Sequence, residues 1–348
     1  IAAIAGAVAT SHAFGQDDSA EPIPTHEEAP APKTPVRFTL FIDNDGVLKP
    51  NDRADRYYTS GVKIDFAFRP DWVRGFADAL PLGADFSKER TAFGVSAGQL
   101  IFTPWHTQRK NPPEDDHPYA GYLYGSVYFQ RAEQPREDDP NHVSTFDHLQ
   151  IDFGVIGPSA LGEQAQNEVH RILDEPLSEG WSHQLHDEFA LNMSFRRKVR
   201  LELAPDEDGV GLQLIPEAGF DVGNVWSQLV GGATVRFGQN MPDDYGPSRL
   251  RLPGSYIAPP KDGFGWQVFG RAEVNTVLWN TFLDGNLWGD SRSVEKNGFV
   301  AEFQVGAVLN FGSNFELGYS QTFQSEQFTT QDGWHSWGSL FIRALWTF

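Results

Sequence analysis

The chain has 348 residues, among them 34 Gly, 27 Phe and 10 Trp, with no Cys and a formal net charge of −20. The lack of Cys excludes disulfides, thiol nucleophiles and Cys-ligated metals, and the acidic balance argues against nucleic acid as a partner, since phosphate binding needs a basic surface. No apolar run approaches the roughly 20 residues of a transmembrane helix, so a helical membrane protein is excluded.

The first two segments are predicted to lie outside the fold. Residues 1–13 form a small apolar stretch that ends Ser11-His12-Ala13, a small-x-small pattern typical of signal-peptide cleavage. Residues 14–36 are rich in Pro and acidic side chains and offer little that could pack. We therefore expect a signal-peptide remnant at 1–13, a disordered leader at 14–36 and the folded domain at 37–348.

From Phe38 onward, apolar side chains alternate with polar or small ones. Residues 299–311 show this most clearly, with seven apolar residues at period two on one face. This stretch is longer than the usual soluble strand of about 5–6 residues, and it suits a tilted membrane strand of about 9–11 residues with an extension. Twelve such segments are predicted: 38–43, 58–68, 91–101, 121–131, 145–156, 188–204, 210–222, 226–238, 263–277, 297–311, 314–325 and 336–348.

The last segment indicates which membrane is involved. It ends in Phe348, with Leu340, Ile342, Ala344 and Trp346 on the same face, as strands of Gram-negative outer-membrane barrels usually end. An even number of antiparallel strands can close a barrel that pairs every backbone group in lipid. We predict an all-β fold, a transmembrane antiparallel β-barrel of about twelve strands with both termini periplasmic. The alternative, a soluble β-sandwich, would have shorter strands and a polar outward face.

Residues 162–173 depart from the strand pattern. Leu161, Ala165, Val169 and Ile172 recur at helical spacing, and Ser159 is the expected N-cap. We expect a short helix of three to four turns between the fifth and sixth strands, which strand parity places on the extracellular side. Two other connections, 69–90 and 239–262, are longer than the short inside turns that such barrels have.

Polar clusters at strand ends and on the helix are predicted to meet at the outer rim. Asp43-Asn44-Asp45 end the first strand and offer hard oxygen ligands that suit Ca²⁺, although Asp and Asn are favoured at any loop start. Thr59 lies at the start of the second strand. Gln166 and His170 share one helix face at i, i+4 spacing, and His can accept a proton from water near neutral pH, although a lone helical His is more often structural.

Together these segments resemble the lipid A 3′-O-deacylase (LpxR) family of outer-membrane enzymes. The likeness covers about 38–188 in detail and the rest only as strand pattern. The residues that carry it are Asp43-Asn44-Asp45-Gly46, Asp55-Arg56-Tyr57-Tyr58-Thr59-Ser60-Gly61, Gly98-Gln99 with Thr103-Pro104, His117-Pro118-Tyr119-Ala120-Gly121-Tyr122-Leu123-Tyr124, and Gly157-Pro158-Ser159 through Gln166 and His170 to Gly180-Trp181 and Gln184-Leu185.

The resemblance implies Ca²⁺-dependent hydrolysis of the ester that holds the 3′-linked acyloxyacyl chain of lipid A, at a site facing the outer leaflet. It implies His170 as the base that activates water, with Gln166, Asn44, Asp45 and Thr59 around the water, the metal and the ester. We expect the metal ligands to be Asp45, Asp43 and an acidic residue after the histidine, for which Glu175 is chosen over the competing Asp174 and Glu179. The family's active-site lysine has no clear match, although Lys110 lies in the corresponding loop. The expected partners are lipopolysaccharide and outer-membrane lipid, without nucleic acid, and the expected state is a monomer.

Two alternatives stay open at the level of sequence. An outer-membrane phospholipase would use a Ser nucleophile, for which Ser60 and Ser159 are candidates. A channel or structural barrel would have a polar lumen throughout and would not depend on the rim clusters. The deacylase hypothesis predicts no acyl-enzyme, because no Ser lies at a readable spacing from the histidine.

Overall fold

The computed structural model describes residues 35–47, 55–76, 86–134, 143–204, 209–252, 254–257 and 261–347. The predicted signal-peptide remnant at 1–13 and leader at 14–36 lie outside these residues, except that Pro35 and Val36 open the first strand.

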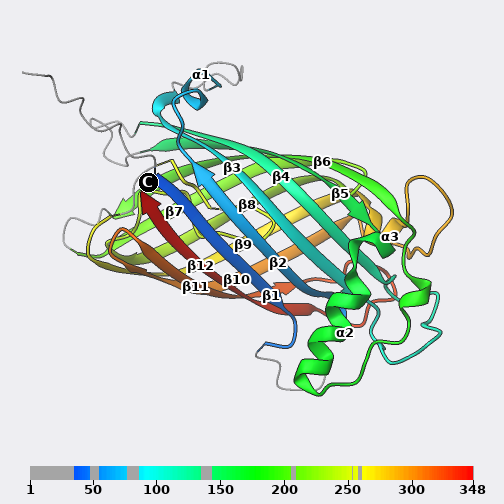
Figure 1. The fold of residues 1–348 in the computed structure, drawn as a ribbon. Helices are drawn as coiled ribbons and strands as arrows, with labels where there is room; N and C mark the ends of the chain where they lie inside the picture. Colours follow the sequence, from blue (N-terminus) through cyan, green and yellow to red (C-terminus); the bar gives the residue numbers. More distant parts are fainter. Residues whose placement is uncertain are drawn as a thin grey trace, which may run out of the picture. The chain divides into compact units, whose positions relative to one another are not determined.

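Twelve antiparallel strands in the described residues close into a barrel (Figure 1). Each strand pairs with its neighbours in the chain, and the first and last strands close the cylinder with Pro35 opposite Thr347. The predicted fold class is therefore confirmed. The strands are β1 (Pro35–Asn44), β2 (Tyr57–Phe68), β3 (Phe86–Thr103), β4 (Ala120–Glu133), β5 (Ser144–Ile156), β6 (Glu188–Ala204), β7 (Gly211–Gly223), β8 (Trp226–Gln239), β9 (Phe264–Asn280), β10 (Phe299–Phe311), β11 (Phe315–Gln324) and β12 (His335–Thr347).

The alternation in the sequence separates the outer wall from the lumen. On β10, Phe303 and Val305 are 47% and 54% exposed on the outside, whereas Gln304 between them is buried and bonds to Ser320 and Thr322 inside. This apolar-out, polar-in pattern is that of a barrel whose wall faces lipid. None of the helices in the described parts of the chain is long and apolar enough to cross a bilayer.

The two ends of the barrel carry different connections. The start of β1 and the end of β12 pair at one end, which also holds α1 (Val73–Phe76) between β2 and β3. The opposite end, called the loop end below, carries the connections that follow the odd-numbered strands. There the β5–β6 connection contains η1 (Pro158–Ala160), α2 (Gly162–Leu173) and η2 (Trp181–His183), and α3 (Thr281–Asp284) follows β9. The helix predicted after the fifth strand is thus confirmed.

The predicted N-cap of this helix was wrong. Leu161, in the left-handed conformation, occupies the N-cap position and makes no side-chain capping bond. Ser159 instead donates its backbone N–H and its hydroxyl to Asp187, over 2.7 and 2.8 Å.

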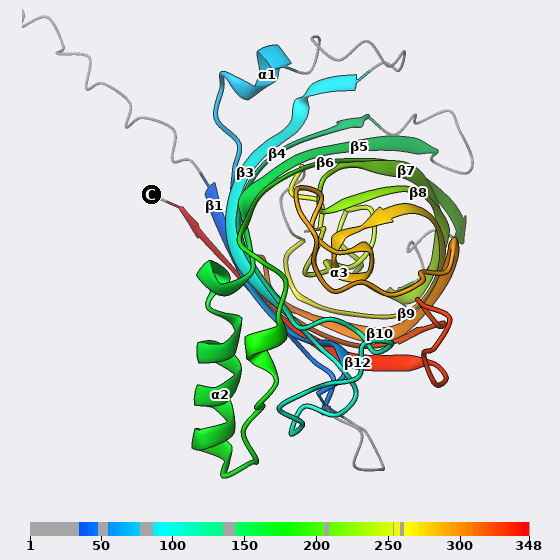
Figure 2. The ribbon, with the colours of Figure 1, turned by 90° about the vertical axis from the view of Figure 1, so that its right-hand side faces the viewer.

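The long β8–β9 connection packs inside the barrel, which explains why it is not a short turn (Figure 2). Tyr245 and Tyr256 of this connection are 1% exposed, and the Tyr256 N–H donates to Gln130 of β4. Burial favours a raised pKa for Asp243, but bonds from Arg90 and Arg200 outweigh it and hold that pKa well below its usual range. Ion pairs with the wall therefore fix the connection in the lumen.

Candidate active site

Helix α2 lies outside the barrel wall at the loop end, against β3 and β4 (Figure 2). Its backbone approaches the wall closely at two glycines, because a Cβ added to Gly121 would lie 3.1 Å from the backbone nitrogen of Gly162. Gln99 of β3 donates to the Ala160 carbonyl just before the helix, over 2.6 Å. The helix is therefore fixed to the outer surface of the strands.

The face of α2 that packs on the wall is polar and uncharged apart from His170. Gly162, Gln166, Asn167 and His170 are buried, whereas Val169 and Ile172 are 50% and 75% exposed. The apolar spacing that predicted the helix therefore does not mark the side that contacts the barrel. The side that carries Gln166 and His170 does.

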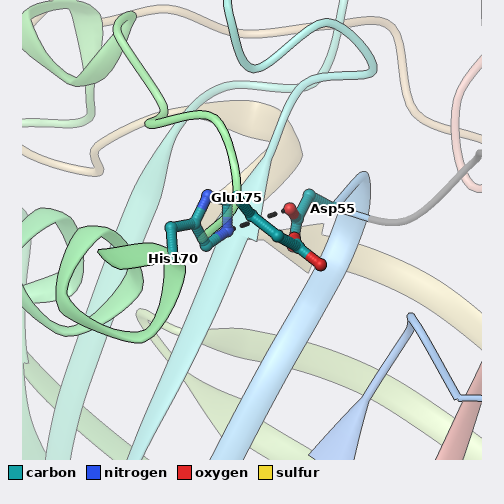
Figure 3. A group of neighbouring side chains, drawn as sticks. All are labelled: Asp55, His170 and Glu175. Atoms are coloured by element: carbon teal, nitrogen blue, oxygen red, sulfur yellow. Dashed lines mark ion pairs between the residues drawn. The ribbon is translucent and has the colours of Figure 1, made fainter. Parts of the chain in front are cut away.

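The contacts of His170 settle which of its ring nitrogens carries the proton. Nδ1 lies 2.6 Å from the Pro176 carbonyl oxygen, and because a carbonyl oxygen can only accept, Nδ1 is the donor. Nε2 is therefore the nitrogen that a second proton would occupy, and in the imidazolium it donates. Nε2 lies 3.0 Å from a carboxylate oxygen of Asp55 (Figure 3). The basic nitrogen of a buried histidine thus faces a carboxylate.

Asp55 is held in place by its own backbone. It has a φ of 58°, in the left-handed region that Asp tolerates better than most residues. Its N–H donates to Asp45 Oδ1 over 2.9 Å, and the next N–H, of Arg56, donates to Asp45 Oδ2 over 3.0 Å. Both oxygens of the fully buried Asp45 carboxylate therefore accept bonds that set the position of Asp55.

A chain of two hydroxyl groups supports Asp55 from the other side. Thr103 Oγ1 donates to the Asp55 carbonyl over 2.9 Å. Thr59 Oγ1 lies 2.7 Å from Thr103 Oγ1, and since the single Thr103 proton is already used, Thr59 is the donor. Thr59 thus lies in the same bonded group as Asp45, Asp55 and His170.

Glu175 completes a group of possible metal ligands. It follows Asp174, the left-handed C-cap of α2, and its N–H donates to the His170 carbonyl over 2.8 Å. Ligand atoms of Asp55, His170 and Glu175 lie within 4.8 Å of one another (Figure 3). Two carboxylates at this spacing are hard oxygen donors of the kind that Ca²⁺ prefers.

Asp43 lies on the other side of the wall from His170. Its carboxylate accepts from the Tyr58 hydroxyl over 2.9 Å and lines a luminal cavity of about 110 Å³ together with Arg249 and Trp226. The structure therefore does not bring Asp43 together with Asp55 and Glu175.

Gln166 and Asn44 are the remaining predicted site residues. Gln166 is 4% exposed, and its Oε1 accepts from Trp181 Nε1 over 3.0 Å. Its Nε2 is buried without a hydrogen-bond partner among the described residues. Asn44 is half-buried at the end of β1, and its Oδ1 accepts the Gly46 N–H over 2.8 Å.

A second rim histidine, His117, differs from His170 in its surroundings. It is 2% exposed, stacks on Phe102 at an interplanar angle of 4°, and bonds the Pro118 carbonyl through Nδ1. Burial lowers the pKa of His117 to about 4, which makes it a weak base near neutral pH.

Asp55 is the site residue that the sequence reasoning missed. It belongs to the 55–61 segment that the sequence singled out, but no spacing rule connects it to the helix. Two signals were present: an Asp two positions before a strand, in a turn where Asp tolerates the left-handed conformation, and an Asp ten positions upstream that could accept its N–H.

The chain is similar to known outer-membrane proteins. The family model described as "Outer membrane protein LpxR" matches residues 3–346. The solved structure of LpxR from Salmonella typhimurium has 22% sequence identity and a TM-score of 0.69, covering 88% of this chain and 99% of that chain. The β domain of the Bordetella autotransporter BrkA has 11% identity and a TM-score of 0.41, covering 90% of this chain and 99% of that chain. Among curated proteins, none matches.

Proposed function

This chain belongs to the LpxR family of outer membrane proteins, and from that premise we propose that it is an esterase that hydrolyses the 3′-O-linked acyloxyacyl chain of lipid A. The observation that carries the proposal is that His170, on the face of α2 packed against the outer wall, lies together with Asp55 and Glu175. A site on this face is reached from the lipid side, where the esters of a membrane lipid lie.

The site supports direct attack by water. With Nδ1 held by the Pro176 carbonyl, Nε2 is the His170 nitrogen left to take the proton of a water molecule. The imidazolium that results faces the Asp55 carboxylate at 3.0 Å, which stabilises its charge. Asp45 and the Thr59–Thr103 pair are positioning residues, because they hold the backbone of Asp55.

Gln166 is the residue that we assign to the ester. Its Oε1 is fixed by Trp181, so the amide group is oriented with Nε2 outward from that bond. A buried N–H donor without a partner costs about 1–3 kcal/mol, and an ester oxygen beside His170 would satisfy it.

The surroundings of Ser159 favour water over a serine nucleophile. The Ser159 hydroxyl donates to Asp187 over 2.8 Å and is exposed, so it is not paired with a histidine. The barrel lumen favours an enzyme over an open channel, because the β8–β9 connection packs within it.

The donor set fits calcium, with ligands that differ from those expected from the sequence. Asp55 and Glu175 would hold the ion, since their carboxylates lie together. Asp45 has both oxygens bonded to backbone N–H groups and Asp43 faces the lumen, so we assign neither as a ligand. When bound, the cation supplies positive charge against the carbonyl oxygen as it becomes an oxyanion.

We further assign the loop end to the cell exterior, where lipopolysaccharide lies, and a single chain as the working unit. The site residues of the described chain lie at the loop end, in the connections that hold Asp45, Asp55, Gln166, His170 and Glu175 and at the adjoining strand ends that hold Thr59 and Thr103. A protease site inserted after Asp115, in the β3–β4 connection, is expected to be cleaved in whole cells. Protection there, with cleavage only after lysis, would contradict this orientation.

The test of the activity uses purified protein in mixed micelles with lipid A or with phospholipid, and mass spectrometry of the products. We expect loss of one acyloxyacyl unit from lipid A, inhibition by EGTA and recovery with Ca²⁺. Ser60→Ala and Ser159→Ala are expected to keep the activity. Release of fatty acid from phospholipid alone, or loss of activity in either serine variant, would favour the phospholipase, and ion conductance without hydrolysis would favour a channel.

A further inference from the structure

The surface of α2 divides into three sectors along its length. At about 100° per residue, the packed sector is Gly162, Gln166, Asn167 and His170. Apolar exposed residues border it on one side, with Leu161 at the N-cap, Val169 and Ile172 beside the packed sector and Leu173 at the last helical position, and these four are called the apolar sector. A polar exposed sector, Gln164, Glu168 and Arg171, borders it on the other.

The apolar sector is large for a surface helix. Its four side chains are 51%, 50%, 75% and 61% exposed in the order given. Single exposed apolar residues are ordinary on any protein, but Val169, Ile172 and Leu173 are neighbours within about one turn of a helix that also has a charged flank. Such a division into an apolar and a charged flank is typical of helices that lie in a membrane interface.

The apolar sector continues a surface that already faces lipid. Helix α2 packs on β3 and β4, where its Ala165 packs with Trp181 of η2 against Ile101. The strands beside it expose apolar side chains on the same outer face, such as Val62 of β2 at 49% and Phe153 of β5 at 48%. Because the apolar sector lies beside the apolar outer face of the wall, one occupant covers both.

The polar sector gives this surface a direction. Arg171 donates to Glu168 over 2.7 Å, and both side chains are more than half exposed. This pair is stable in water or among lipid headgroups and unfavourable among acyl chains. The two flanks of α2 therefore suit the two sides of the boundary between acyl chains and headgroups.

From this arrangement we infer that α2 is a membrane-contacting element, with its apolar sector among the acyl chains of the outer leaflet and its polar sector toward the headgroups. His170 follows Val169 directly, so the helix fixes the depth of the histidine at the boundary where acyl esters lie. The inference concerns lipid contact and does not depend on the hydrolytic activity.

The lack of native Cys allows a direct test by site-directed spin labelling. Single variants Val169→Cys, Ile172→Cys and Glu168→Cys carry a nitroxide in the full protein, reconstituted in vesicles of phospholipid and lipopolysaccharide. Val305→Cys on β10, 54% exposed on the outer wall, is the matched lipid-facing control. Collision with oxygen reports acyl chains, and collision with a water-soluble nickel chelate reports water.

We expect the labels at 169 and 172 to behave like the label at 305, with several-fold more collision with oxygen than with the chelate. The label at 168 should show the reverse preference. Labels at 169 and 172 that meet the chelate as often as the label at 168 would overturn the inference.

A second variant tests whether the apolar sector itself sets the depth. Ile172→Asp is combined with the label at 169, and folding of the barrel is checked by its heat-dependent migration in gels. We expect the label at 169 to gain chelate collisions several-fold. Unchanged collisions in a folded barrel would show that the strands alone set the depth, and would overturn the inference.

Discussion

Replacing Asp55 by Asn tests the role of the carboxylate that faces His170. Asn has nearly the same shape and tolerates the left-handed φ of 58° that Asp55 adopts. Its backbone N–H and carbonyl keep their bonds to Asp45 and Thr103. The substitution therefore removes a negative charge and leaves the support of the site in place.

The expected loss follows from the 3.0 Å contact between the Asp55 carboxylate and His170 Nε2. A hydrogen bond to a charged group contributes about 1.5–3 kcal/mol, and Asp55 would make this bond to the imidazolium that forms as water is deprotonated. At 1.36 kcal/mol per factor of ten, kcat falls about 10- to 150-fold. The calcium concentration for half-maximal activity should also rise, because one of two carboxylates is neutralised.

The assay measures fatty acid released from lipid A over a calcium titration, with folding checked by heat-dependent gel migration. Glu168→Gln is the matched control, since it neutralises an exposed carboxylate on the polar sector of the same helix. An Asp55→Asn protein within about twofold of the wild-type kcat at saturating calcium would refute the assignment.

Four further outcomes are expected. Asp45→Ala leaves two backbone N–H groups unpaired, at about 1–3 kcal/mol each, so activity should fall steeply in a folded barrel. Asp45→Asn keeps one acceptor and should lose less activity, and equal losses in the two variants would contradict this. Glu175→Gln should raise the calcium requirement with little change in kcat, and an unchanged requirement would remove it from the ligand set. Gly121→Val should displace α2, because even a Cβ at this position meets the helix backbone at 3.1–3.2 Å. Proteolysis of the β5–β6 connection should then accelerate while the barrel resists the protease. An unaltered rate of proteolysis would argue against this packing. The stabilisation that comes from neutral His117 is full above its unfolded pKa of 6.5 and is lost as pH falls toward the folded pKa of about 4. The loss is about 2 kcal/mol by pH 5, so the thermal midpoint of wild type should fall more between pH 7 and 5 than that of His117→Phe. Equal falls in the two proteins would contradict this.

Local pattern was enough to predict the strands. A strand with one apolar and one polar side shows period-two alternation in its own sequence, as residues 299–311 do. Each strand could therefore be predicted from its own segment, without knowledge of its neighbours. Closure then followed from the need to pair every backbone group in lipid. The same alternation directs Asp43 to the face opposite that of Ile42, which is the lumen. The interpretation of residues 43–45 as one ligand cluster did not take this signal into account.

Long-range contacts decide what the sequence did not predict. The β8–β9 connection enters the lumen because Asp243 meets arginines of β3 and β6, which are more than 40 residues away. The face of α2 that carries Gln166 and His170 packs on the wall because these side chains bond to Trp181 and Asp55. No spacing within the helix encodes those partners, so the apolar residues at helical spacing predicted the helix without predicting its orientation.

The base assigned to His170 is tested most directly by the rate of fatty-acid release from lipid A by His170→Gln, measured by mass spectrometry beside wild type in calcium. The glutamine keeps a polar group next to Asp55 but cannot take a proton from water at neutral pH, so a folded barrel whose rate is roughly 10²–10⁴-fold lower is the predicted result. A folded variant that releases the 3′-linked chain at the wild-type rate would contradict the account.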